Sequence, residues 1–223
     1  MNKKPDWDHY FHSHYQPVGG KWGKADLEKY RTWYASWVTY FENHFHFSFT
    51  GKSAIELGCG IGAFCSLLAD RGCDVTGSDI SQEMIASAAA VCPNIPFVYC
   101  DIIAGLEQKK KFDYVFAFEV LEHLPTLDPA IENIKKILLP DGWFIGSSPY
   151  PYPKNMQDPT HVNVHKPEFW KELFVKHEFR NVSVHPLSVL PALWKHAPAL
   201  NPRLPFYLPW TGIVSTSLIF AQK

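Results

Sequence analysis

The segment IELGCGIGAF contains a glutamate, Glu56, followed by three glycines within five positions, Gly58, Gly60 and Gly62. Glycines in such a turn tolerate positive φ and let the backbone approach a ligand closely. The spacing satisfies a relaxed form of the dinucleotide fingerprint, so the glycines alone leave NAD, FAD and other adenosine ligands open. Glu56 narrows the choice, because a carboxylate repels a pyrophosphate but can accept hydrogen bonds from an ammonium group. The turn therefore favours a zwitterionic ligand.

Two further acids follow the next apolar segments. Asp79 stands 21 residues after Gly58, where a carboxylate can accept hydrogen bonds from both ribose hydroxyls of an adenosine. Asp101 can accept a hydrogen bond from the adenine amino group, with the backbone of Ile102 as a donor. Both acids have a structural alternative, since an aspartate at the end of a strand can also cap the following helix. Together with Glu56 they predict S-adenosylmethionine, which carries an ammonium and a sulfonium but no phosphate.

The run FDYVFAFEVLEHLP places two acids and a histidine directly after a predicted strand. Glu119, Glu122 and His123 should therefore lie at the carboxyl edge of a parallel sheet, where ligands bind in open α/β folds. An imidazole titrates near neutral pH. His123 is therefore the candidate general base, which would remove a proton from the nucleophilic group of the second substrate. Its alternatives are contact with the acceptor and a structural role beside its own short helix.

The loop PYPYPKNMQDPTHVNVHKPE carries a second polar group, which consists of Asp158, His161, Asn163 and His165. We expect His161 to line the acceptor site, and its alternative is a loop histidine that is hydrogen-bonded for structure. His161 and His165 with Asp158 also have the donor types of a metal site. No cysteine or second acid reinforces them, so the sequence predicts no metal.

The elements that must position these residues alternate between strand and helix. Short apolar runs predict strands at residues 53–57, 73–78, 95–100, 112–118, 143–148, 181–187 and 210–220. Helical patterns cover residues 25–46, 62–71, 81–91, 128–138 and 166–177. Ser81 and Asp128 are the expected N-caps of two of these helices, and Pro129 and Pro167 the expected first helical positions. Alternating strands and helices predict βαβ units and a parallel sheet.

Two regions flank or interrupt this pattern. Residues 1–49 are expected to form a helical segment that packs on the core or over the site, and residues 50–223 to form the main domain. An aromatic cage for substrate is the alternative for the helix at 25–46. Residues 188–210 form an insert rich in proline and aromatic residues, for which we expect a lid or a wall of the acceptor site. A dimer contact or a shallow membrane-docking surface is the alternative.

Composition limits the class of partner. Lys and Arg number 21 against 22 Asp and Glu, which gives no basic footprint for nucleic acid. No apolar run is long enough to span a membrane, and the N-terminus does not resemble a signal peptide. The five cysteines form no CxxC pair, so free thiols and a cytoplasmic location are expected. The remaining partner is a small-molecule methyl acceptor, bound by a monomer or homodimer.

Four ordered motifs carry a family resemblance. ELGCGIG with the following Asp79, CDI, FDYVFAFEVLEHL and LLPDGWFIGSSP together resemble the class I S-adenosylmethionine-dependent methyltransferases. The similarity is to the small-molecule group that includes the ubiquinone-biosynthesis O-methyltransferases, strongly over residues 50–150 and loosely over 156–185. It implies an α/β fold, a Rossmann-like three-layer αβα sandwich. Its seven-stranded, mostly parallel sheet would have the order 3214576, with the last strand antiparallel.

The resemblance also implies cofactor contacts. From the methionine end to the adenine end, the residues concerned are Glu56, Gly58, Cys59, Gly60, Gly62, Asp79, Ile80, Asp101 and Ile102. Phe118 and Glu119 would line the wall beside the sulfonium. The expected reaction is an in-line transfer of the methyl group to an O or N nucleophile, with His123 and His161 on the acceptor side. Holding the reactants in line supplies roughly 7–11 kcal/mol.

Two other functions remain open at this stage. An NAD-dependent oxidoreductase would share the glycine turn and Asp79, but it leaves Glu56 unexplained, and no Tyr-x-x-x-Lys constellation is evident. A methyltransferase-like protein that binds the cofactor without turnover is the other alternative. The N-terminal region lacks the patterns expected of a true ubiquinone-pathway enzyme, so the sequence leaves the identity of the acceptor open.

Overall fold

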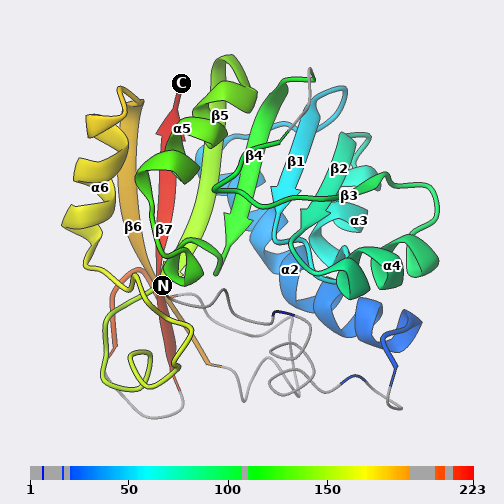
Figure 1. The fold of residues 1–223 in the computed structure, drawn as a ribbon, viewed down its shortest axis with the longest axis horizontal. Coiled ribbons are helices and arrows are strands. Elements are labelled where there is room, and N and C mark those ends of the chain that lie inside the picture. The colour runs from blue at the N-terminus through cyan, green and yellow to red at the C-terminus, as the bar shows by residue number, and fades with distance from the viewer. Residues whose placement is uncertain (1–6, 8–16, 18–20, 107–109, 191–203, 209–212) are drawn as a thin grey trace. The chain divides into compact units, whose positions relative to one another are not determined.

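A computed structural model describes residues 7, 17, 21–106, 110–190, 204–208 and 213–223 (Figure 1). The strands are β1 (Ser53–Leu57), β2 (Asp74–Asp79), β3 (Phe97–Tyr99), β4 (Phe112–Phe118), β5 (Leu138–Pro149), β6 (Arg180–Val189) and β7 (Val214–Gln222). The helices are α2 (Lys24–Phe45), α3 (Ala63–Ala69), α4 (Gln82–Val91), the short 3-10 turn η2 (Leu121–His123), α5 (Asp128–Ile137) and α6 (Pro167–Lys176).

The seven strands form one sheet in the order β3-β2-β1-β4-β5-β7-β6. β2 is parallel to β1 and β3, and β4 is parallel to β5, whereas β7 is antiparallel to both β5 and β6. The predicted order 3214576 with an antiparallel last strand is therefore confirmed. By its internal contacts the chain divides into two compact units, Met1–Asp101 and Ile102–Lys223.

The first unit contains β1 to β3 with α2, α3 and α4. The helix predicted at residues 25–46 is α2, whose aromatic stripe buries Trp37 and Phe41. α2 packs against α3, where the Tyr34 ring meets the Phe64 ring edge-on with centroids 5.6 Å apart. Ser81 is the N-cap of α4, because its Oγ accepts a 3.1 Å hydrogen bond from the Met84 amide. The predicted cap is confirmed, and within the first unit the N-terminal helix α2 lies against α3.

The second unit contains β4 to β7 with η2, α5 and α6. α5 packs on β4 and β5, and α6 packs on β6 and β7 (Figure 1). Phe144 on β5 stacks on Phe174 of α6 with ring centroids 4.8 Å apart, and both side chains are fully buried. These contacts form the apolar layer that supports the strand ends.

The structure corrects the predicted start of α5. Leu127 is the N-cap, and Asp128 is the first residue of the helix, so Pro129 is not at the first position. The Asp128 carboxylate instead accepts hydrogen bonds of 2.7 Å from Lys176 and from His177. The capping prediction was wrong because the Lys176 and His177 side chains compete with the backbone amides of α5 for the Asp128 carboxylate.

Other predicted boundaries shift by a few residues. β3 is shorter than residues 95–100, while β5 begins five residues before the predicted 143. β6 continues to Val189, so the predicted insert at 188–210 loses its first two residues to a strand. Most of the rest of the insert lies outside the described residues. Among the described residues, no helix combines the length and apolar character needed to cross a membrane.

Candidate active site

The glycine turn after β1 is a compact backbone structure. The amides of Gly58 and Cys59 both donate to the Ser78 carbonyl, at 2.8 and 2.9 Å. Gly58, Gly60 and Gly62 all have positive φ, which L side chains rarely adopt. The turn therefore needs its glycines for backbone geometry, as the spacing predicted.

Glu56 lies at the end of β1 with only 2% of its surface exposed. Its Oε2 accepts a hydrogen bond from the Cys65 thiol at 2.9 Å. Burial raises the pKa of the Glu56 carboxyl to about 8; hydrogen bonds from Cys65 lower that pKa, and the nearby Asp79 charge raises it. None of the groups that shift this pKa is a cation. A carboxyl in such a position gains a great deal from a positively charged ligand group.

Asp79 lies at the end of β2 and is 3% exposed. Its two carboxylate oxygens accept separate hydrogen bonds of 2.9 Å, Oδ2 from the Gly60 amide and Oδ1 from the Ser81 amide. Asp79 thus joins the glycine turn to the start of α4. Its position at the carboxyl end of β2 is the one at which a carboxylate can meet the ribose of an adenosine ligand.

The remaining predicted cofactor residues of the first unit lie nearby in sequence. Cys59 is buried, and Ile80 and Asp101 are half-buried. The carboxylates of Asp101 and Asp79 both contribute to raising the pKa of Cys100, although burial is the larger cause. In the second unit, Ile102 and Phe118 are buried, and the Ile102 carbonyl accepts a 3.0 Å hydrogen bond from the Asn133 amide.

Glu119 follows β4 with φ of 54°, an uncommon conformation for a residue other than glycine. Its Oε1 lies 2.6 Å from the Ser147 hydroxyl and 2.8 Å from the Thr216 hydroxyl. Although the residue retains exposed surface, protein atoms surround its carboxyl and raise its pKa by partial removal from water. Its two hydroxyl partners come from β5 and β7, so two neighbouring strands of the second unit hold this side chain at the end of β4.

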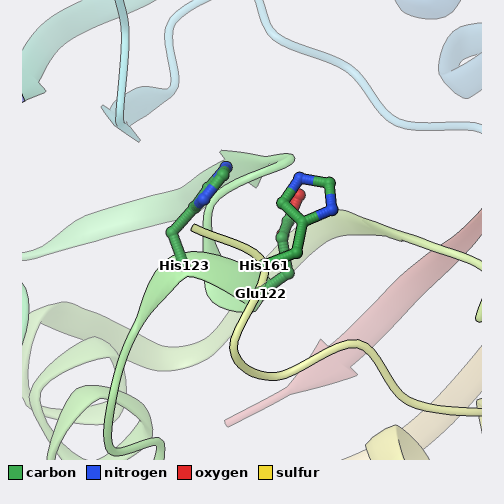
Figure 2. Close-up of side chains that lie close together, drawn as sticks. All are labelled: Glu122, His123 and His161. Carbon is green, nitrogen blue, oxygen red and sulfur yellow. The ribbon is translucent and has the colours of Figure 1, made fainter. Parts of the chain in front are cut away.

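Three side chains form a cluster beside Glu119, which we call the Glu122 cluster. It consists of Glu122 and His123 from η2 and of His161 from the loop before α6 (Figure 2). One ligand-type atom from each residue lies within 4.8 Å of the other two, and the histidine rings meet edge-on with centroids 4.9 Å apart. His123 and His161, predicted separately from two segments, are therefore brought together.

Backbone contacts hold the cluster in place. The Glu122 carbonyl accepts hydrogen bonds of 2.9 Å from the amides of both Val162 and Asn163. The Asn163 side chain donates to the Leu124 carbonyl. The two loop residues that follow His161 are thereby tied to η2 and to Leu124, which places His161 beside His123.

The sequence offered His161, His165 and Asp158 only as a disfavoured alternative set of metal ligands, and in the structure His165 makes contacts of its own. The His165 ring stacks on Phe169, with centroids 3.6 Å apart, and its Nε2 lies 3.1 Å from the Asn163 side-chain oxygen. Asp158 Oδ1 accepts hydrogen bonds from the amide and hydroxyl of Thr160, while Oδ2 lies 3.9 Å from His161 Nε2. The acid that lies beside both histidines is Glu122, which the sequence placed with His123 at the carboxyl edge of the sheet but did not connect with His161.

Comparison with known proteins identifies relatives over part of the chain. A ubiquinone biosynthesis O-methyltransferase from Paraburkholderia phymatum is 30% identical over 117 residues, which are 50% of this chain and 49% of that protein. The enzyme of the same name from Methylococcus capsulatus is 36% identical over 102 residues, 44% of this chain and 43% of that protein. The chain thus spans about half the length of these curated relatives.

Solved structures share the fold. An S-adenosylmethionine-dependent methyltransferase from Archaeoglobus fulgidus matches 98% of this chain and 100% of its own, with a TM-score of 0.65 and 19% identity. The Haemonchus contortus phosphoethanolamine N-methyltransferase 2, solved with phosphomonomethylethanolamine and S-adenosylhomocysteine, matches 97% of this chain and 59% of its own, with a TM-score of 0.69 and 16% identity. The model of one family, described as a methyltransferase domain, matches residues 28–184, and the chain therefore belongs to that family.

Proposed function

We propose that this chain transfers a methyl group from S-adenosylmethionine to a hydroxyl oxygen of a small molecule. The observation that carries the proposal is Glu56, a buried carboxyl beside a glycine turn with a pKa of about 8. The ammonium of the methionine portion would supply the missing positive charge, in a charge-assisted hydrogen bond. A pyrophosphate in the same place offers no positive charge and would make ionisation of Glu56 still harder, so NAD is disfavoured.

The other cofactor contacts remain part of the proposal. Asp79, with Ile80, would accept the ribose hydroxyls, and its bonds to the Gly60 and Ser81 amides fix the carboxylate beside the glycine turn. Asp101 and the Ile102 backbone are assigned to adenine. Phe118 and Glu119 stay predictions for the sulfonium end.

Oxygen is favoured as the acceptor atom because the curated relatives that match part of this chain are named O-methyltransferases. A hydroxyl must lose its proton during transfer, and the Glu122 cluster offers imidazoles for that task. The His123 Nδ1 lies 3.2 Å from the Thr160 carbonyl, which can only accept a hydrogen bond. The proton is therefore on Nδ1, and Nε2 carries the lone pair that would take the proton of the acceptor.

Binding and turnover test different parts of this proposal. Titration calorimetry should show S-adenosylhomocysteine binding and no NAD binding; the opposite result would remove the cofactor assignment. A radiolabelled methyl donor should then transfer its label to phenols and catechols in a panel that also contains amines of similar size. Labelling of the amines alone would overturn the choice of oxygen. Binding of S-adenosylhomocysteine without any transfer would favour a cofactor-binding protein.

A further inference from the structure

We propose that Glu122, His123 and His161 bind a divalent transition-metal ion, through one carboxylate oxygen and two imidazole nitrogens. Figure 2 shows the three side chains extending to the same side from η2 and the loop. The existence of the metal site is independent of the proposed function. The role of the metal in catalysis, described below, rests on the proposed function.

Glu122 is the first reason to infer a cation. It is 0% exposed, and neither of its carboxyl oxygens has a hydrogen-bond partner among the residues that the structure describes. A buried polar group that lacks a partner destabilises the folded chain, and a charged group does so more strongly. A metal ion bound to Glu122 would replace the missing partner. The carboxyl already lies within 4.8 Å of two imidazole nitrogens, which are common metal ligands.

The orientation of the two imidazoles is the second reason. His161 Nδ1 lies 2.7 Å from the Asn155 carbonyl, and His123 Nδ1 lies 3.2 Å from the Thr160 carbonyl. Carbonyl oxygens accept hydrogen bonds, so both rings carry their proton on Nδ1 and present the lone pair of Nε2. Metal-binding histidines characteristically donate their other ring N–H to a backbone carbonyl or carboxylate in this way.

The donor set selects the kind of metal. Two imidazoles and one carboxylate are the ligands of catalytic zinc sites and of non-haem iron(II) sites, both of which keep open positions. Mg²⁺ prefers oxygen donors and is disfavoured. Ligands of tetrahedral zinc are about 3.4 Å apart when the bonds are about 2.1 Å long. Metal binding would therefore draw the three ligand atoms together from separations of up to 4.8 Å.

A metal at this place would change how the acceptor is activated. A hydroxyl oxygen that occupies an open position on the metal has a lowered pKa, and its proton leaves to solvent. The oxygen then forms the new C–O bond as the C–S bond to the sulfonium breaks, which yields S-adenosylhomocysteine and the methyl ether. His123 would be a ligand in this form, and the metal would replace it as the group that makes the hydroxyl nucleophilic.

The test uses the full chain, stripped with a chelator and then titrated with Zn²⁺ by calorimetry and with Co²⁺ by visible absorption. We expect one ion per chain. His123→Ala, His161→Ala and Glu122→Gln should each weaken Zn²⁺ binding by more than the 10–100-fold that loss of an outer-shell partner costs. His165→Ala is the matched control, a histidine of the same loop outside the cluster, and it should bind Zn²⁺ like the wild type. Circular dichroism checks that each variant is folded.

Three outcomes would overturn the metal site. These are no saturable binding of Zn²⁺ or Co²⁺ to the wild type, equal binding by wild type and the cluster variants, or an equal loss in His165→Ala. S-adenosylhomocysteine affinity, measured on the same samples, should be the same for the wild type and all four variants. If Zn²⁺ binds while S-adenosylhomocysteine does not, the proposed function fails and the metal site stands. Once an acceptor is known, methyl transfer should stop after chelation and return with the metal.

Discussion

Replacing Glu56 with glutamine is expected to stabilise the ligand-free chain and to abolish binding of S-adenosylhomocysteine. The Glu56 carboxyl has a pKa of about 8 in the folded chain against an ordinary value of 4.5. Between these values the folded chain keeps a proton that the unfolded chain releases, so the free energy of unfolding falls as pH rises. At about 1.4 kcal/mol per pH unit, the penalty is on the order of 3 kcal/mol at pH 7 and about 5 kcal/mol above pH 8.

Glutamine has nearly the same shape, can still accept the Cys65 hydrogen bond and carries no charge, so the variant should escape this penalty. Urea unfolding at acidic, neutral and mildly alkaline pH measures the difference. The advantage of Glu56→Gln should be small near pH 5 and grow toward a plateau above about pH 8. Glu132→Gln, at an exposed glutamate of α5, is the control and should show no such trend. A variant that is less stable than the wild type at alkaline pH, or an advantage independent of pH, would refute the reasoning.

Three further predictions concern the same unit. Asp79→Asn turns an amide N–H toward one of the two backbone N–H groups that the carboxylate now accepts from. Calorimetry should show the affinity for S-adenosylhomocysteine reduced about 10- to 150-fold, which corresponds to about 1.5–3 kcal/mol. Unchanged affinity would contradict the ribose assignment. Gly62→Ala places a Cβ 2.7 Å from the Phe97 ring at φ of 79°, and urea unfolding should show a loss of about 1–3 kcal/mol. Because Glu56 must lose its proton to accept an ammonium, S-adenosylhomocysteine affinity should rise by up to about tenfold per pH unit below pH 8; proton release, detected as buffer-dependent binding heat, checks this origin.

The sequence was most informative where structure is local. The strands at residues 53–57 and 112–118 have the predicted ends, because each is a single apolar run bounded by polar residues or a glycine turn. The start of β5 was missed because Pro140, Asp141 and Gly142 have the composition of a loop. The tertiary pairing of Leu138 with Phe112, followed by a register shift, extends the strand through them.

In the candidate site too, the residues marked by local sequence patterns were predicted, and those that depend on tertiary contacts were not. Glu56 and Asp79 were found because each ends a strand at a spacing that has chemical meaning. The Glu122 cluster was missed as a unit, since its histidines come from segments joined only by loop hydrogen bonds. The hydroxyl of Thr216 lies against Glu119 although 97 residues separate them in sequence. No local pattern marks a threonine for such a contact.

The position of β7 between β5 and β6 has a consequence for folding kinetics. β5 and β6 cannot reach their final places until the last strand in the sequence enters between them, along registers that pair Pro149 with Thr216 and Val189 with Val214. Such long-range pairings carry a large loop-closure entropy and form slowly. Until β7 has paired with β5, the Glu119 carboxyl lacks its Thr216 partner, so this side chain should acquire its final orientation only late in folding.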